Sequence, residues 1–177
     1  MTPDIRDLGF LGIDPGLSGA FGFVVGGKAF AWDVPTYKVK VAKGLRTRLD
    51  EDALQRLVYR IARMSPERAL LELVGGMRDD DGSRHMAFTF GFSAGQIRQA
   101  IVAAGIPRDG VQASVWKLRM GLRGQTKDAS RALASQLFPS SAHLFARKKD
   151  DGRAEAVLLA EYARRTYLGG LLNASTD

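Results

Sequence analysis

Three short apolar segments near the N-terminus constrain the fold of this chain more than any other feature. They are residues 10–14, 20–25 and 28–34, and only Gly26 and Gly27 separate the last two. A Gly-Gly pair between two such segments is a strong signal for a two-residue β-hairpin turn. The chain is therefore expected to open with three antiparallel strands.

Two further apolar segments, 69–74 and 111–114, alternate with helical patterns in the rest of the sequence. Strands that alternate with helices favour parallel pairing in one sheet. Apolar periodicity, caps and breakers predict four helices, one between Asp50 and Pro66 and the others over residues 87–104, 126–137 and 151–167. The sequence thus predicts an α/β fold in one domain, residues 1–177: a mixed five-stranded sheet, three antiparallel strands then parallel strands, flanked by helices.

The segment between the third strand and the first helix is strongly basic. It shows no clear period, so we expect an extended loop, and its five cations are Lys38, Lys40, Lys43, Arg46 and Arg48. The whole chain has 26 Lys and Arg against 19 Asp and Glu, a formal net charge of +7. This balance favours polyanionic partners, above all nucleic acid. The loop is interpreted either as a surface that follows DNA phosphates or as a merely solvated loop.

Composition also excludes several classes of protein. The chain has no cysteine, which excludes a disulfide framework and thiolate-bound zinc. No segment approaches the roughly 20 apolar residues of a membrane span, and the N-terminus lacks the apolar core of a signal peptide. A cytoplasmic protein with no membrane partner is expected, in a bacterium or in a phage-infected host cell.

Acidic residues stand in apolar surroundings at three places. Asp14 ends the first strand, Glu72 lies among aliphatic residues, and Asp151 and Glu155 share one face at the start of the last helix. A buried carboxylate must be paired, hydrogen-bonded or bound to a cation. Several carboxylates in one place would repel each other, and a divalent cation reverses that penalty.

Oxygen ligands without cysteine or paired histidines favour Mg²⁺ or Mn²⁺ over zinc. Two such ions could activate water and stabilise the leaving oxygen of a phosphodiester. Each acid alone also has a plain structural explanation: a strand-ending turn for Asp14, a salt bridge for Glu72 and a helix cap for Asp151. The order of the acids along the predicted elements favours a shared site.

The chain resembles the RuvC-like Holliday-junction resolvases of the RNase H-like superfamily, most closely their plastid and phage branch. The resemblance runs from about Leu11 to Ala163. It is carried by five segments: residues 12–20, 114–117, 126–131, 137–139 and 148–156. It implies an RNase H-like fold and a crossover junction endodeoxyribonuclease, a hydrolase with two Mg²⁺ per active site that Mn²⁺ can replace.

The resemblance also assigns roles to particular residues. Asp14 resembles the metal-bridging aspartate, Glu72 the glutamate of the central strand, and Asp151 and Glu155 the two acids of the last helix. Bacterial RuvC enzymes space those last acids three apart and usually end with Asp, whereas here the spacing is four and the second acid is Glu. Asp150 therefore stays open as an alternative to Asp151.

Two lysines complete the expected site. Lys117 and Lys127 resemble lysines that approach DNA phosphates near the cut, and Lys127 is expected to join the catalytic set. Both are also explained as ordinary solvated helix lysines.

The implied activity is the introduction of paired symmetric nicks into four-way DNA junctions. Such a substrate suits a homodimer with two-fold symmetry. The helix over residues 87–104, with Gly91, Ala94 and Gly95, is the expected dimer interface. Two alternatives stay open: a less selective RNase H-like nuclease on flaps, forks or RNA–DNA hybrids, and a junction-binding protein without catalysis. The sequence does not reveal the nucleotide preference at the cut or the biological pathway.

Overall fold

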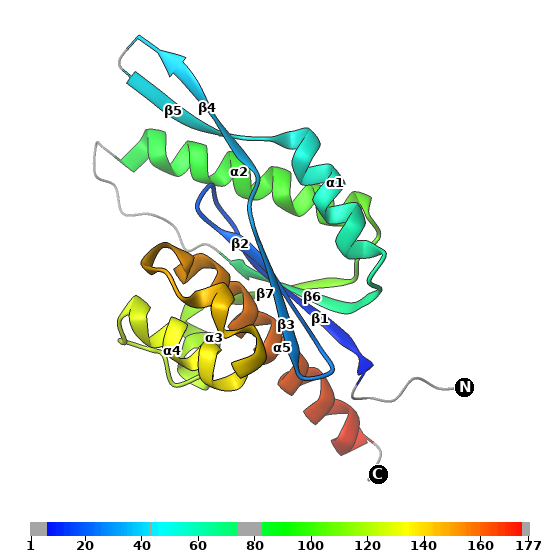
Figure 1. Cartoon of the computed structure of the whole chain (residues 1–177). Helices are drawn as coiled ribbons and strands as arrows, with labels where there is room; N and C mark the ends of the chain where they lie inside the picture. The colour runs from blue at the N-terminus through cyan, green and yellow to red at the C-terminus, as the bar shows by residue number, and fades with distance from the viewer. Residues whose placement is uncertain (1–6, 43, 74–82, 175–177) are drawn as a thin grey trace.

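A five-stranded mixed sheet lies at the centre of the molecule (Figure 1). The computed structural model describes residues 7–42, 44–73 and 83–174. The strand order is β3-β2-β1-β6-β7; the first three are antiparallel neighbours, and β6 and β7 run parallel to β1. The predicted α/β fold with its mixed sheet is confirmed. The strands are β1 (Gly9–Asp14), β2 (Ala20–Val25), β3 (Lys28–Asp33), β6 (Pro66–Leu73) and β7 (Arg108–Gln112).

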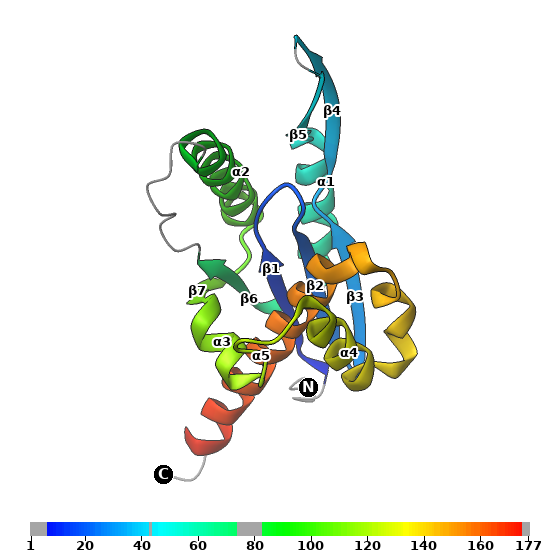
Figure 2. The same cartoon turned by 90° about the vertical axis from the view of Figure 1, so that its left-hand side faces the viewer.

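Helices cover both faces of the sheet, and each face has its own apolar core (Figures 1 and 2). Leu11 and Ile13 pack in the core under α1 and α2, whereas Phe10 and Leu70 pack in the core under α3, α4 and α5. Successive strand residues thus serve opposite faces. The α-helices are α1 (Glu51–Ala62), α2 (Ser83–Ala103), α3 (Ala113–Arg119), α4 (Lys127–Leu137) and α5 (Asp151–Ala174), and η2 (Pro139–Phe145) and η3 (Lys148–Asp150) are 3-10 turns.

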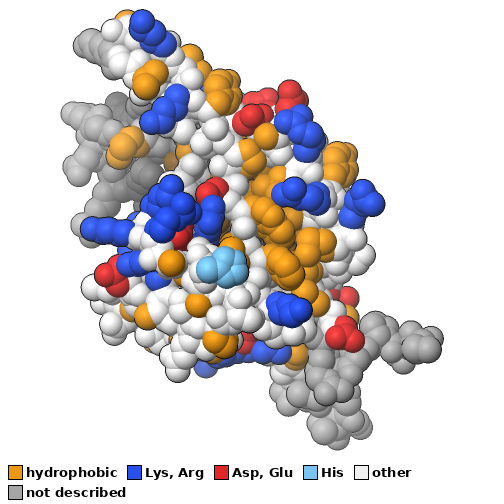
Figure 3. Space-filling model, viewed as in Figure 1, with side chains coloured by type: hydrophobic (Ala, Val, Ile, Leu, Met, Phe, Trp, Pro, Cys, Tyr) orange, Lys and Arg blue, Asp and Glu red, His pale blue; other side chains and the backbone are white. Residues whose placement is uncertain are grey.

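The basic segment is a β-hairpin, so the predicted extended loop is wrong. It consists of β4 (Thr36–Val41) and β5 (Gly44–Leu49), which pair with each other and project from the body of the molecule (Figures 1 and 2). Val39 and Val41 alternate with Lys38 and Lys40, which is the period of a strand. Lys and Arg side chains gather along the hairpin and in a second patch below it (Figure 3).

Some element boundaries also differ from the predictions. The strand predicted over residues 111–114 ends at Gln112, because α3 begins at Ala113. Asp50 caps α1 as expected, since its Oδ1 accepts the N–H of Ala53 at 2.9 Å. Thr126 occupies the N-cap position of α4 without a side-chain hydrogen bond. Of the helices in the described ranges, none combines the length and the apolar character needed to cross a membrane.

Helix α5 lies very close to the sheet because two glycines face it. Gly12 of β1 and Gly22 of β2 are register partners. A Cβ at Gly12 would overlap the carbonyl oxygen of Ala156, and a Cβ at Gly22 would overlap the backbone of Val157. The backbone of the helix therefore contacts the backbone of the strands directly. This contact brings the first turns of α5 to the end of β1.

The far part of α5 carries a buried ionic cluster that predicts a pH-dependent stability. Burial raises the pKa of Glu161, but hydrogen bonds from Arg164 and Arg165 outweigh that effect and leave the pKa lowered. Glu161→Gln is expected to lower the free energy of unfolding by about 1–2 kcal/mol at pH 7, since bonds to charged groups are worth roughly that much. A depressed folded-state pKa stabilises the fold above the unfolded value of 4.5, and this contribution is lost as the pH falls through the folded pKa.

Urea unfolding at several pH values checks this expectation. The difference between native protein and Glu161→Gln should shrink as the pH is lowered below about 4.5. A difference that stays constant with pH would mean that packing, and not the charge of Glu161, is responsible.

Candidate active site

Asp14 lies at the end of β1 on the face that α5 covers. It is two residues beyond Gly12 and so shares its face. Its Oδ2 lies 3.5 Å from the position that a Cβ would take at Gly152 in the first turn of α5. Burial, followed by the negative charge of Glu72, is the main reason that the pKa of Asp14 is raised from 3.8 to about 7. Asp14 is thus a crowded carboxylate at the junction of strand and helix.

Three other acids act on Asp14 electrostatically. Glu72, Glu155 and Asp151 all raise its pKa, and only the ammonium group of Lys117 is identified as lowering it. They belong to β6 and α5, elements that are remote from β1 in sequence but adjacent in the fold. The structure therefore gathers the four acids that the sequence singled out into one electrostatic environment.

Each of these three acids has a donor of its own. The indole N–H of Trp116 donates to Glu72 Oε2 at 2.7 Å. The Nζ of Lys117 lies 2.9 Å from Glu155 Oε2, and the Nζ of Lys127 lies 2.7 Å from Asp151 Oδ2. The hydrogen bond from Lys127 lowers the pKa of Asp151. Both lysines of the expected site therefore reach it, one from α3 and one from the start of α4.

Asp150 has a different role from its neighbour. It is only 2% exposed, and it accepts hydrogen bonds from the backbone N–H and the guanidinium of Arg147. These bonds lower its pKa and close the turn before α5. Asp151, and not Asp150, is the acid that acts on Asp14. Of the two alternatives left open by the sequence, the geometry favours Asp151.

The four carboxylates are suitable ligands for a hard divalent cation, but their side chains are not arranged around a single point. Within the residues that the structure describes, no three acidic, histidine or cysteine side chains converge closely enough to hold a metal ion. The ammonium groups of Lys117 and Lys127 neutralise two of the acids instead. Carboxylate oxygens are the ligands preferred by Mg²⁺. A half-buried carboxylate such as Asp14, with three like charges around it, is the kind of group that a cation stabilises.

The hairpin divides its basic residues between two faces. Cross-strand partners point to the same side of an antiparallel pair. Arg46 and Arg48 oppose Val39 and Tyr37, whereas Lys38 and Lys40 oppose Thr47 and Leu45. One face therefore carries guanidinium groups and the other carries ammonium groups. Lys43 lies outside the described residues.

Trp116 is a site residue that the sequence reasoning missed. It is fully buried in the core under α5, and Lys117 lies over its ring at 5.3 Å. The only signal for it was its place beside Lys117 in a segment that resembles the family. Its bond to Glu72 depends on how α3 packs on β6, which no local pattern encodes.

The chain is similar in sequence to one named protein and in fold to solved structures. No protein-family model matches the chain. The chloroplastic Holliday junction resolvase MOC1 of Chlamydomonas reinhardtii is 37% identical over 90 residues, which are 50% of this chain and 10% of that protein. The chain thus spans about a tenth of the length of this curated relative.

Solved structures match over nearly the whole length. RuvC of T. thermophilus in complex with a Holliday junction substrate superposes with a TM-score of 0.61 at 17% identity, covering 92% of this chain and 96% of that one. A second Thermus thermophilus RuvC structure gives a TM-score of 0.55, also at 17% identity, covering 92% and 97%. The chain has the RuvC fold. The predicted RNase H-like architecture and the resemblance to RuvC-like proteins are both confirmed.

Proposed function

We propose that this chain is a Holliday-junction resolvase, a structure-selective endonuclease that makes paired symmetric nicks in four-way DNA junctions. The observation that carries the proposal is the environment of Asp14, a half-buried carboxylate with three further acids and two lysines around it on a RuvC fold. The relative that is named as a resolvase supports the choice of substrate.

In this proposal Asp14, Glu72, Asp151 and Glu155 hold two Mg²⁺, which Mn²⁺ can replace. When bound, the ions supply an activated water and neutralise the charge on the leaving oxygen of the phosphodiester. In the absence of DNA, Lys117 and Lys127 pair with two of these acids. Released from Glu155 and Asp151, their ammonium groups would turn to the DNA phosphates beside the cut. The products would carry a 5′-phosphate and a 3′-hydroxyl.

We also propose that the chain acts as a homodimer through α2. Phe88, Gly91, Phe92 and Gly95 follow the spacing i, i+3, i+4, i+7 on this helix and form one exposed stripe. A Cβ at Gly91 or at Gly95 would meet nothing within 4 Å, so the stripe is not packed against the part of the chain that the structure describes. Small and aromatic residues on one exposed face suit close packing against a second copy, which would present two sites to a two-fold symmetric junction.

Trp116 is expected to position Glu72. Trp116→Phe keeps a buried ring but removes the indole N–H, so Glu72 loses its donor. Mutation of a residue that hydrogen-bonds to a metal ligand typically lowers metal affinity or activity by about 10–100-fold. We expect the Mg²⁺ concentration for half-maximal cleavage to rise at least tenfold. Trp32→Phe, at the other tryptophan, is the control and should leave this concentration unchanged. If Trp116 has only a structural role, Trp116→Phe should also leave the Mg²⁺ concentration unchanged.

Lys38 is expected to contribute to DNA binding through charge alone. Lys38→Gln should reduce the slope of the logarithm of the binding constant against the logarithm of salt concentration by about 0.9, because one fewer counterion is released. Lys28→Gln is the control, since it removes the same charge from the first residue of β3, at the end of the sheet away from Asp14. Equal slopes for both variants would exclude Lys38 from the DNA interface.

One assay tests the proposed function. Four-way junctions, flaps, forks, RNA–DNA hybrids and linear duplex are offered with Mg²⁺ to native protein and to Asp14→Asn. Paired symmetric nicks confined to junctions are expected, with binding but no cutting by the variant. Equal cutting of flaps or hybrids would favour a less selective nuclease, and tight junction binding without cleavage would favour a protein that only binds.

The cellular compartment, expected to be the cytoplasm, stays a prediction, because the curated relative is named as a chloroplast protein.

A further inference from the structure

The outer edge of β3 lies in an open groove. β3 is the first strand of the sheet, so β2 pairs with one of its edges and no strand of the described sheet pairs with the other. Two hollows of about 410 and 780 Å³ flank this edge, one toward η2 and one toward α1, and Ala31 and Trp32 line both. Hydrophobic side chains gather in the middle of this face of the molecule (Figures 1 and 3). We call the two adjoining hollows the β3 groove.

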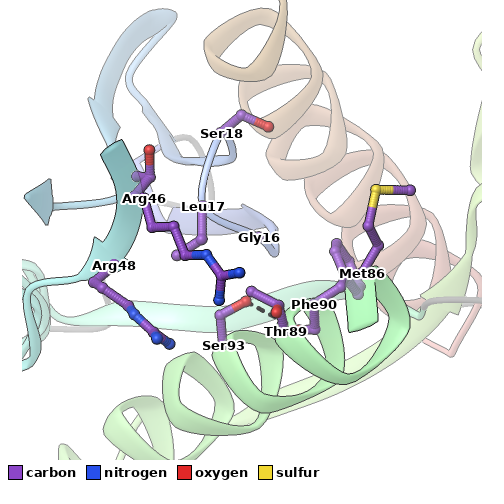
Figure 4. Close-up of a pocket in the computed structure, with 10 residues that line it drawn as sticks. Gly16, Leu17, Ser18, Arg46, Arg48, Met86, Thr89, Phe90 and Ser93 are labelled. Atoms are coloured by element: carbon purple, nitrogen blue, oxygen red, sulfur yellow. Dashed lines mark hydrogen bonds between the residues drawn. The ribbon is translucent and has the colours of Figure 1, made fainter. Parts of the chain in front are cut away.

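The β3 groove is separate from the acidic site. In the sheet, β2 lies between β3 and β1, the strand that carries Asp14. A pocket of about 510 Å³ beside the β1–β2 turn, which is lined by Arg46 and Arg48 of β5, shares no residue with the groove (Figure 4). The groove is thus a second surface, outside the acidic site.

The edge of β3 presents backbone groups to the groove. The N–H of Ala29 donates to the Oγ of Ser141 at 3.2 Å, so it points away from β2. Backbone groups alternate in direction along an antiparallel strand, and those of Ala31 therefore point the same way. In the part of the chain that the structure describes, no residue of a neighbouring element on this side hydrogen-bonds to Ala31. An edge with such groups can pair with an added strand.

Aromatic side chains lie beside this edge. The rings of Phe30 and Trp32 stack with their centroids 6.3 Å apart and an angle of 8° between their planes. Phe30 is 38% exposed. The guanidinium of Arg60 lies 5.9 Å from the centre of the Trp32 ring, so a nucleotide base cannot stack on that face of the indole. Apolar side chains at alternate positions of an extended peptide could lie against these rings.

The border of the groove carries positive charge. Arg56 and Arg60 line it from α1, where they are exposed and one helical turn apart. The acid that lines the groove is Asp33, and Arg153 already holds both of its carboxylate oxygens at 2.6 Å. The two arginines of α1 are therefore matched to negative charge on a ligand.

We propose that the β3 groove binds an extended acidic segment of a partner protein. The backbone of the segment pairs with Ala31, and its apolar side chains lie against Phe30 and Trp32. Its carboxylates meet Arg56 and Arg60. Duplex DNA would use only the two arginines, whereas an acidic peptide uses the strand edge and the aromatic rings as well. This interaction goes beyond the proposed function and does not depend on it.

Selection from a random displayed peptide library, on the whole native chain, tests the groove. We expect the selected peptides to alternate apolar and acidic residues. The double variant Arg56→Gln, Arg60→Gln should weaken their binding about tenfold, because two exposed ion pairs are lost. Arg63→Gln is the matched control, since Arg63 is exposed at the end of the same helix but does not line the groove. It should bind these peptides as the native protein does.

The strand edge is tested separately. Addition of a selected peptide should slow amide hydrogen exchange at Ala31 in the native protein, which requires no variant. Ala31→Pro removes the outward N–H, a change that edge strands tolerate, and should weaken binding about tenfold or more. Thermal unfolding checks that this variant is folded.

Two results would overturn the proposal. One is a selection that yields no acidic peptides, or peptides that bind the arginine double variant as well as they bind Arg63→Gln. The other is displacement of the peptides by four-way junction DNA, together with weaker junction binding by the arginine double variant, because the groove would then be a DNA surface.

Discussion

Replacement of Asp14 by Asn is expected to abolish cleavage and, at the same time, to stabilise the metal-free protein. Burial and three neighbouring acids raise the pKa of this carboxyl from 3.8 to about 7, which means that its charge is costly in the folded state. One pKa unit corresponds to about 1.4 kcal/mol. Because Asp14 is partly exposed and Lys117 offsets some of the repulsion, we expect a gain of about 1–3 kcal/mol at pH 7.

Urea unfolding in the presence of a chelator measures this gain. Asp33→Asn is the matched control, since Asp33 is an exposed acid that pairs with Arg153 and should gain nothing from losing its charge. Added Mg²⁺ should then raise the unfolding temperature of the native protein and leave that of Asp14→Asn nearly unchanged. An Asn variant that is less stable than the native protein without metal would contradict the crowding of acids around Asp14.

The second large effect is expected at Gly12. Gly12→Ala would place a methyl group on the carbonyl oxygen of Ala156, so either β1 or α5 must move. Overpacking of this kind costs about 3 kcal/mol or more when the obstacle is backbone. A shift of about 1 Å in catalytic groups can reduce a rate 100-fold. We therefore expect both the free energy of unfolding and the rate of cleavage per folded molecule to fall.

Thermal unfolding and single-turnover cleavage separate these two losses. Gly169→Ala is the control on the same helix, because a Cβ there meets nothing within 4 Å. It should be neutral or stabilise the protein by up to about 1 kcal/mol, as Ala replaces Gly in a helix. Full activity in folded Gly12→Ala protein would show that the close approach of α5 to β1 is not needed for the chemistry.

Much of the sheet was predictable because its signals are local. Gly26 and Gly27 define one turn, and apolar segments of strand length define the rest. The β4–β5 hairpin was not predicted because its high charge conceals the period of a strand, although Val39 and Val41 alternate with lysines. Its projection from the body is a property of the fold and has no signal in the segment itself.

The site was predictable as a set of acids but not as an arrangement. The order of Asp14, Glu72 and Asp151 along the elements was enough to select them. The choice between Asp150 and Asp151 was not, because the two are adjacent and only the turn held by Arg147 decides which one faces away from Asp14. Donors such as Trp116 lie on helices that meet the acids only in the folded chain, so no sequence spacing reveals them.

The paired glycines under α5 have a consequence for how the protein tolerates change. Where two backbones are in contact, no side chain can change its rotamer to alter the distance between them. The separation of the helix acids from Asp14 therefore does not depend on how well side chains elsewhere are packed. Substitutions in the two apolar cores should therefore lower the fraction of folded molecules without altering the rate of each folded one. Robustness of this kind leaves the cores free to drift in sequence while the spacing of the acids stays fixed.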